Sequence, residues 1–149
     1  MPQFTMESPV GLLTITEENG TLTALHFGGE SETPPPTPLL QEVLRQLTAY
    51  FAGTLTAFDL PLAPKGTPFQ QAVWRALCVI PYGQTRSYSE IAAAIGRPNA
   101  CRAVGMANHQ NPIAIIVPCH RVVGKGGALT GYAGGLAVKQ ALLAFEQKK

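Results

Sequence analysis

Apolar residues in the first third of the chain follow two different spacings. Residues 4–27 contain strand-like apolar runs, and Asn19-Gly20 lies between two of them, as is typical of a hairpin turn. These runs predict a small β-meander. Within residues 39–52, apolar side chains recur at helical spacing, which predicts one amphipathic helix.

Two segments rich in proline interrupt this pattern. Residues 31–38 predict an exposed loop, because proline lacks the backbone N–H that regular structure requires. Residues 58–66 are also rich in proline, and they predict a linker between domains. We therefore expect an N-terminal domain with its linker over residues 1–65 and a second domain over residues 66–149.

Capping boxes mark the start of two helices in the second half. Residues 67–70 form the first box, with proline at the first helical position, and predict a helix to about residue 80. Residues 87–90 form the second and predict a helix to residue 95. A third helix is expected over residues 98–108, after a turn that contains glycine. Two short helices joined by such a turn predict a helix-turn-helix.

The third of these helices has two different faces. Four apolar residues recur at helical spacing and are expected to face the core: Ala100, Ala103, Val104 and Ala107. Arg102 projects from nearly the opposite side, with Gly105 and Met106 near it. One long cation among small residues suits close approach to a nucleic-acid groove. An ordinary solvated arginine is the other interpretation.

Residues 114–123 bring a cysteine to the end of an apolar, strand-like run. A proline precedes Cys119, and His120 and Arg121 follow it. The thiolate is the nucleophilic form of cysteine, and nearby positive charge lowers the pKa of a thiol. His120 and Arg121 are the expected source of that charge, which indicates a reactive cysteine. Packing in the core is the alternative, because neighbouring side chains on a strand point to opposite faces.

The other two cysteines, Cys78 and Cys101, fall in predicted helices, where packing is the expected role. Three cysteines in all suit a reducing cytoplasm better than a disulfide framework. No Cys-x-x-Cys motif or histidine cluster occurs, so we expect neither a metal nor a cofactor. No apolar run approaches the length of a membrane span, and no membrane association is expected.

The two halves of the chain carry opposite charge. Residues 1–65 contain two basic and seven acidic residues, whereas residues 66–149 contain nine basic and two acidic residues. This difference suggests a surface for a polyanion on the second domain. The alternative is that the charges only keep the chain soluble, and the charge balance alone does not distinguish these two interpretations.

Taken together, segments of the second half resemble the O6-alkylguanine-DNA alkyltransferases, also called methylated-DNA–protein-cysteine methyltransferases. The resemblance extends from about Phe69 to Glu146, with a weaker match over the N-terminal sheet, and is strongest at residues 102–105, 111–112, 116–123 and 131–139. It implies an α+β fold. A small N-terminal α/β domain, ribonuclease-H-like in topology, would be followed by a mostly helical domain with a winged helix-turn-helix.

The resemblance also implies direct DNA repair by a chain that acts once. Cys119 would accept the alkyl group of O6-alkylguanine in one in-line displacement, and O4-alkylthymine is a further candidate substrate. His120 would act as the base through a bridging water, oriented by Glu146. Tyr88 would donate a proton toward guanine N3, and Asn111 would brace the recognition helix against the active-site turn.

Double-stranded DNA, bound through its minor groove, is the implied partner. The damaged guanine would be flipped out, because its O6 substituent cannot be reached inside the base stack. Arg102 would fill the space left by that base. Contacts with DNA are expected from Tyr88, Arg102, Ala103, Gly105 and Met106, and the pocket for the base is expected from Val122, Tyr132, Ala133 and Gly134.

One departure from the family and two rival functions remain. Some relatives hold zinc in the N-terminal domain, but no cysteine precedes Cys78 here, so that site is not expected. A helix-turn-helix DNA-binding regulator without chemistry would explain the basic half alone. A Cys-His hydrolase of the papain type would explain Cys119 and His120 alone. For the alkyltransferase, a monomer is expected.

Overall fold

The computed structural model describes residues 1–132 and 134–147. The chain divides into two compact units, Met1–Pro64 and Lys65–Lys149, called here the N-terminal and C-terminal units. The first is built on a sheet and the second mostly on helices, which confirms the mixed α and β class. Among the described residues, no helix is both long and apolar enough to cross a membrane.

The N-terminal unit contains a three-stranded antiparallel sheet, as the apolar runs predict. Its strands are β1 (Gln3–Ser8), β2 (Gly11–Glu18) and β3 (Thr21–Phe27), in the order β1-β2-β3. Asn19 and Gly20 join β2 to β3 with positive φ angles of 52° and 77°. Such angles suit asparagine and glycine in a two-residue hairpin turn.

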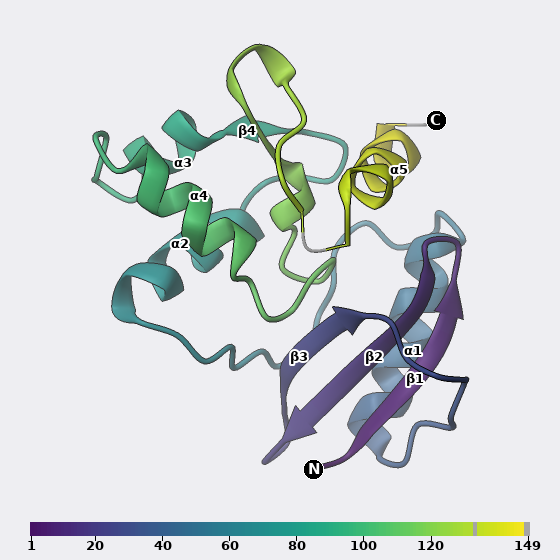
Figure 1. Cartoon of the computed structure of the whole chain (residues 1–149). Coiled ribbons are helices and arrows are strands. Elements are labelled where there is room, and N and C mark those ends of the chain that lie inside the picture. Colours follow the sequence, from purple (N-terminus) through teal and green to yellow (C-terminus); the bar gives the residue numbers. More distant parts are fainter. Residues whose placement is uncertain (133, 148–149) are drawn as a thin grey trace. The chain divides into compact units, whose positions relative to one another are not determined.

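Helix α1 (Pro38–Phe51) covers one face of this sheet (Figure 1). It begins after Thr37, whose hydroxyl accepts a hydrogen bond from the Leu40 N–H at 3.1 Å. Its apolar stripe packs on alternate residues of the strands, because side chains of a strand alternate between faces. The fully buried members of this core include Leu13, Ile15, Leu22, Leu40, Val43, Leu47 and Tyr50.

Part of the predicted linker belongs to the N-terminal unit instead. Leu62 forms a parallel bridge with Leu22 of β3. The Leu22 N–H donates to the Pro61 carbonyl at 2.8 Å, and the Ala63 N–H donates to the Leu22 carbonyl at 2.9 Å. The segment therefore satisfies polar groups at an otherwise unpaired sheet edge, and the prediction of a simple linker over residues 58–66 is wrong there.

The C-terminal unit opens with the predicted helices and both capping boxes. Helix α2 spans Pro68–Cys78, and α3 spans Tyr88–Ala94 after the short strand β4 (Arg86–Ser87). In each box the cap hydroxyl accepts from a backbone N–H and the Gln70 or Glu90 side chain accepts in return. Helix α4 spans Cys101–His109, so it begins three residues later than the predicted helix over residues 98–108.

The buried face of α4 also differs from the predicted one. Val104, Ala107 and Asn108 are buried, but Ala103 is exposed. The indole N–H of Trp74 donates to the Ala107 carbonyl at 2.8 Å, which fixes α4 against α2. This contact orients the helix so that position 103 faces solvent, and the prediction that Ala103 faces the core is wrong.

The remaining elements begin at Cys119 and run to the end of the described chain, coloured from green to yellow in Figure 1. A 3₁₀ turn, η1 (Cys119–Arg121), leads into β5 (Val122–Val123), which pairs with β4 in parallel. A second turn, η2 (Lys125–Gly127), and a loop then lead to helix α5 (Leu136–Gln147). Helix α5 packs against η1, so the cysteine turn lies between helices from distant parts of the sequence.

Candidate active site

The apolar run before Cys119 is a tight turn rather than a strand. Ile115 has a positive φ of 70°, which is unusual for a β-branched residue. Asn111 holds the turn, since its Nδ2 donates to the Val117 carbonyl at 2.9 Å and its Oδ1 accepts from the Ile113 N–H at 3.0 Å. The asparagine therefore sets the direction in which the chain enters Cys119, and the predicted strand is wrong.

Cys119 and His120 lie together in the 3₁₀ turn, both buried. The exposed fraction of Cys119 is 4% and that of His120 is 0%. Asn108, on α4, donates from Nδ2 to the Cys119 carbonyl at 3.3 Å. Because the two residues are on a turn, the objection that strand neighbours point apart does not apply here.

Glu146 of α5 joins both residues that follow the cysteine. His120 Nε2 lies 2.7 Å from Glu146 Oε2. Arg121 donates from Nε to Oε1 at 2.8 Å and from Nη2 to Oε2 at 3.0 Å, and it also donates to the Ile80 carbonyl. Glu146 is only 4% exposed, so it is a buried member of the cluster and not a surface residue of a frayed helix end.

This pairing decides the charge of the imidazole. Burial lowers the pKa of His120, although the hydrogen bond and charge of Glu146 act in the opposite direction. The positive charges of Arg121 and Lys139 lower it further. His120 is therefore neutral at neutral pH, and with Glu146 accepting from Nε2–H, its Nδ1 carries the free lone pair. Among the described residues, Nδ1 is buried without a hydrogen-bond partner.

Burial raises the pKa of Cys119 in the free protein. Hydrogen bonds from Asn111 and Tyr132 and the positive charge of Lys139 oppose that rise. The prediction that His120 and Arg121 supply the positive field is wrong, because the first is neutral and the second is neutralised by Glu146. Lys139 supplies that charge instead.

Lys139 is the functional residue that the sequence reasoning missed. Its side chain is fully buried on α5, and its Nζ donates to the carbonyl and hydroxyl oxygens of Thr130 at 3.3 and 3.4 Å. A signal was available in the sequence. Lys139, Leu142 and Glu146 recur at helical spacing and form the buried face of α5, so two charged residues share a face with leucine.

The other predicted pocket residues surround this cluster to different extents. Val122 is fully buried, Tyr132 is 7% exposed, and Gly134 is partly exposed. Tyr88, at the start of α3, is partly exposed, and its hydroxyl is hydrogen-bonded to that of Thr130. Ala133 lies outside the described residues.

Four of the five residues predicted to contact DNA are on α4, and the fifth, Tyr88, is the first residue of α3. Arg102, Ala103 and Met106 are exposed, and the exposed fraction of Met106 is 66%. Gly105 lies against Tyr88, since a Cβ at that glycine would stand 3.9 Å from two ring carbons of the tyrosine. The exposed face of α4 and the first residue of α3 are thus adjacent.

The remaining cysteines have different surroundings. Cys78 is exposed at the end of α2, so the prediction that it packs in the core is wrong. Cys101 is partly exposed, with its Sγ 3.3 Å from the Ser89 hydroxyl. Across the described part of the chain, no three histidine, cysteine or acidic side chains gather where they could hold a metal ion.

Comparison with known proteins identifies the family of both units. A family model described as "6-O-methylguanine DNA methyltransferase, DNA binding domain" matches residues 68–148. A second, described as "6-O-methylguanine DNA methyltransferase, ribonuclease-like domain", matches residues 3–64. Together the two matches account for nearly all of the chain.

Individual relatives are similar over the same extent. The methylated-DNA–protein-cysteine methyltransferase of Methanosarcina barkeri is 52% identical, covering 95% of this chain and 94% of its own. That of Mycolicibacterium paratuberculosis is 53% identical, covering 97% and 91%. The structure of Mycobacterium tuberculosis OGT in complex with DNA superposes with a TM-score of 0.89 at 53% identity, covering 97% of this chain and 92% of that one. The resemblance drawn from the sequence is confirmed, and this chain belongs to the 6-O-methylguanine DNA methyltransferase family.

Proposed function

We propose that this chain repairs DNA by moving the alkyl group of O6-alkylguanine onto its own Cys119, once per chain. The observation that carries the proposal is the set of groups around one buried thiol. Hydrogen bonding by Asn111 and Tyr132 and the positive charge of Lys139 favour the ionised form of the Cys119 thiol and so oppose the rise in its pKa on burial, and His120 follows Cys119 in the same buried turn. A helix-turn-helix regulator without chemistry has no use for such a set.

The first step is removal of the thiol proton. A water between Sγ and His120 Nδ1 would carry the proton to the imidazole, whose free lone pair is at Nδ1 because Glu146 engages Nε2. Arg121 neutralises part of the Glu146 charge, so the carboxylate does not keep His120 protonated before the reaction. The same carboxylate can still stabilise the imidazolium once His120 has taken the proton. The Cys119 thiolate then forms beside the Lys139 ammonium.

Transfer is an in-line displacement at the alkyl carbon. The bond from Sγ to carbon forms as the bond from carbon to O6 breaks, and the electron pair stays on the guanine. Tyr88 donates its hydroxyl proton toward guanine N3 to neutralise that charge. Val122, Tyr132, Ala133 and Gly134 would surround the base. A thioether is a poor leaving group, so the thiol is not regenerated.

DNA is expected to bind across α3 and α4 through its minor groove. Arg102, Ala103, Gly105 and Met106 form the contacting face, and the chain from β5 into the η2 loop would be the wing of a winged helix-turn-helix. Arg102 would fill the stack after the guanine is flipped out, offsetting part of an unstacking cost of a few kcal/mol. The basic balance of residues 66–149 supports binding that weakens as salt rises.

Replacing Arg102 separates flipping from transfer. Arg102→Ala should slow repair of duplex O6-methylguanine roughly tenfold or more, because a flipped base then loses its substitute in the stack. Reaction with free O6-benzylguanine, which needs no flipping, should change far less. Equal losses on the two substrates would remove the stacking role and leave Arg102 a structural residue.

Further proposals concern the state and location of the chain. Free cysteines at positions 78, 101 and 119 support function in a reducing cytoplasm. The site is built entirely from residues of the C-terminal unit, which supports action as a monomer.

A stoichiometry experiment tests the proposal. With duplex containing O6-methylguanine in excess, repaired DNA should rise to one equivalent per chain and then stop. Cys119→Ser should repair nothing while still binding the lesion duplex, and Cys78→Ser should behave as the wild type. Sustained turnover would favour a hydrolase, and binding without loss of the alkyl group would favour a regulator.

A further inference from the structure

The segment between α2 and β4 lies against the buried pair of Arg121 and Glu146. The Ile80 carbonyl accepts from Arg121 Nη1 at 2.8 Å, and the Tyr82 ring lies over the guanidinium, with 5.7 Å from Cζ to the ring centroid. A Cβ at Gly83 would stand 3.2 Å from the Glu146 carbonyl oxygen, so this glycine approaches the backbone of α5 closely. The segment thus contacts both members of the pair.

A tight turn places the Tyr82 ring on this pair. The Gln84 N–H donates to the Pro81 carbonyl at 3.1 Å, which closes a four-residue turn. Gly83 is the third residue of that turn and has a φ of 80°, a left-handed conformation that favours glycine. Strand β4 follows two residues later and pairs with β5, which begins directly after Arg121. The turn is therefore anchored to the part of the chain that carries the arginine.

The ring suits a guanidinium that is buried with its carboxylate. Arg121 donates from Nε and Nη2 to Glu146 and from Nη1 to Ile80, so the edges of the guanidinium are bonded and its face is left to the ring. An aromatic face attracts a cation, and the attraction increases when water is excluded. Burial raises the pKa of Tyr82, and the charge of Glu146 raises it further, so the phenol is neutral at neutral pH. Tyr82 therefore covers the pair without adding a charge to it.

We propose that Tyr82 is a positioning residue for the transfer reaction: its ring holds the Arg121 guanidinium on Glu146 and so keeps His120 in the neutral form that accepts the thiol proton. The inference rests on the proposed function, because a neutral His120 matters for the rate only if this residue is the base. Tyr82 acts through Arg121 and Glu146, so the loop before β4 takes part in the chemistry without touching the substrate.

Charges from the cysteine turn and from α5 act on the imidazole of His120. Burial lowers the pKa of His120, and the hydrogen bond and charge of Glu146 raise it. The positive charges of Arg121, from the same turn, and of Lys139, from α5, lower it. Cys119 is uncharged in the free protein, because burial raises the pKa of its thiol. An Arg121 that is held on Glu146 therefore opposes the carboxylate that favours an imidazolium.

Loss of the ring would change this balance in one direction. With water in place of the Tyr82 ring, the Arg121 guanidinium could turn away from Glu146 and become solvated. Its lowering effect on the pKa of His120 would decrease, and the raising effect of Glu146 would be less opposed. Both changes raise the pKa of His120, so the imidazole would stay protonated, and unable to accept the thiol proton, up to a higher pH.

Two substitutions at Tyr82 test the inference. Tyr82→Leu removes the aromatic face, whereas Tyr82→Phe keeps it. With free O6-benzylguanine, which needs no DNA binding, the acidic limb of the rate against pH should move up by about one pH unit in Tyr82→Leu, so the rate on that limb falls by up to about tenfold. At higher pH, where His120 is neutral in every variant, Tyr82→Leu should react within about twofold of the wild type. Tyr82→Phe should follow the wild type throughout.

Direct titration of His120 gives a second measurement that does not depend on transfer. The imidazole nitrogens are followed by NMR as the pH is varied, and His120→Gln identifies the signal among the three histidines. The pKa of His120 should be higher in Tyr82→Leu than in the wild type or in Tyr82→Phe. Tyr82→Met takes the place of Tyr82→Leu if the latter does not fold.

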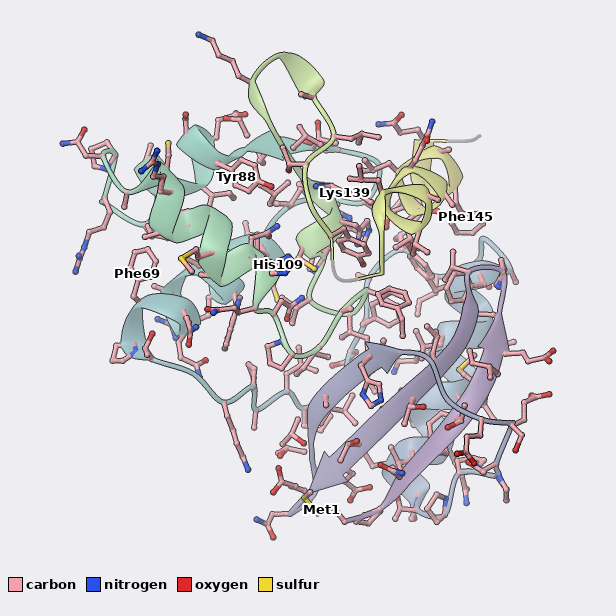
Figure 2. All side chains as sticks on the ribbon, viewed as in Figure 1. Met1, Phe69, Tyr88, His109, Lys139 and Phe145 are labelled. Atoms are coloured by element: carbon pink, nitrogen blue, oxygen red, sulfur yellow. The ribbon has the colours of Figure 1, made fainter. Side chains whose placement is uncertain are left out.

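Phe69 provides a matched control. Its ring centroid lies 6.0 Å from Arg97 Cζ, so Phe69→Leu also removes an aromatic face from a guanidinium of the same unit. Figure 2 labels Phe69 on α2 and Phe145, the neighbour of Glu146, on α5, and the two lie well apart. Phe69→Leu should therefore change neither the acidic limb of the rate nor the titration of the buried histidine.

The outcomes separate this inference from the proposed function. An acidic limb or a His120 pKa that is unchanged in Tyr82→Leu would overturn the inference, as would an equal slowing at every pH or an equal effect of Tyr82→Phe. In each of these cases the wild type would still transfer its alkyl group. A wild type that transfers nothing to Cys119 would instead refute the proposed function, and the titration of His120 would still show whether the ring controls its charge.

Discussion

The two units differ most in the polar groups that they bury. In the N-terminal unit these are neutral: Thr5, Thr14, Thr16 and Gln46. The described part of the C-terminal unit instead buries four basic or acidic side chains, His120, Arg121, Lys139 and Glu146, and they belong to the cluster around the cysteine turn. Since burying a charge costs far more than burying a bonded hydroxyl, the contrast indicates where stability has been given up for chemistry.

A second contrast lies within the charged cluster itself. Glu146 is bonded by both Arg121 and His120, so its charge is balanced within the core. Lys139, by contrast, donates to the two oxygens of Thr130 and, within the described part of the chain, is paired with no carboxylate. Removing one or the other should therefore have opposite effects on stability, although both should reduce activity.

The largest effect is expected from Glu146→Gln. This change leaves the Arg121 guanidinium buried without its carboxylate, and breaking a buried pair in this way should lower the free energy of unfolding by about 3 kcal/mol. Transfer should also be lost, since His120 loses its orienting group. Urea denaturation measures the first effect. Glu42→Gln, which removes the exposed pairing with Arg45 on α1 and keeps an amide oxygen to accept from Gln46, is the control and should change stability far less.

His120→Gln should slow transfer about 100-fold at neutral pH while leaving the buried Arg121–Glu146 pair in place. In the wild type, burial lowers the pKa of His120. The ring therefore stays neutral, and able to accept a proton, until the pH falls below that lowered pKa. The variant has no such base, and its rate should rise only at higher pH, where the thiol ionises unaided. A rate measured against pH with the same profile in both proteins would exclude His120 as the base.

Lys139→Met should separate stability from activity. Folding lowers the pKa of Lys139 below its value in the unfolded chain, so the protonated lysine destabilises the folded protein. This loss of stability is complete at a pH below the folded-state pKa and disappears as the pH rises from the folded-state pKa to the unfolded-state pKa. Methionine removes it and should raise the free energy of unfolding by about 1 kcal/mol at neutral pH. Transfer should slow about tenfold as the pKa of Cys119 rises further. A variant that is less stable than the wild type would contradict this account of Lys139.

The smallest effect is expected from a buried polar group of the N-terminal unit. The Thr14 hydroxyl donates to the Gly28 carbonyl at 2.8 Å and lies 2.9 Å from the Thr5 hydroxyl. Thr14→Val should cost about 1 kcal/mol of stability and leave the transfer rate of the folded protein unchanged. A change in that rate would show that the sheet takes part in the chemistry.

Elements specified by neighbouring residues could be predicted from the sequence. The Asn19-Gly20 turn and both capping boxes depend on residues within four positions of one another, and the structure contains all of them. The pairing of Leu22 with Leu62 could not be predicted in this way. It depends on an unpaired sheet edge forty positions away, and a proline-rich composition gives no indication of that edge.

The site divides in the same way. The motif around Cys119 could be recognised, but its electrostatics depend on α5, where Glu146 neutralises Arg121 and Lys139 approaches the thiol. Because His120 and Arg121 directly follow Cys119 in the sequence, the sequence alone indicates that they supply the positive charge. Only the packing of α5 on η1 reverses that assignment, because it brings together residues about twenty positions apart.

Mapping the alkyl group by mass spectrometry tests the central claim most directly, namely that surroundings and not accessibility select the acceptor. After reaction with duplex containing O6-methylguanine, the protein is digested and its three cysteine peptides are compared. The account predicts one methyl group on buried Cys119 and none on Cys101 or on Cys78, which is the exposed thiol. Methylation of Cys78 or Cys101 in place of Cys119 would contradict it.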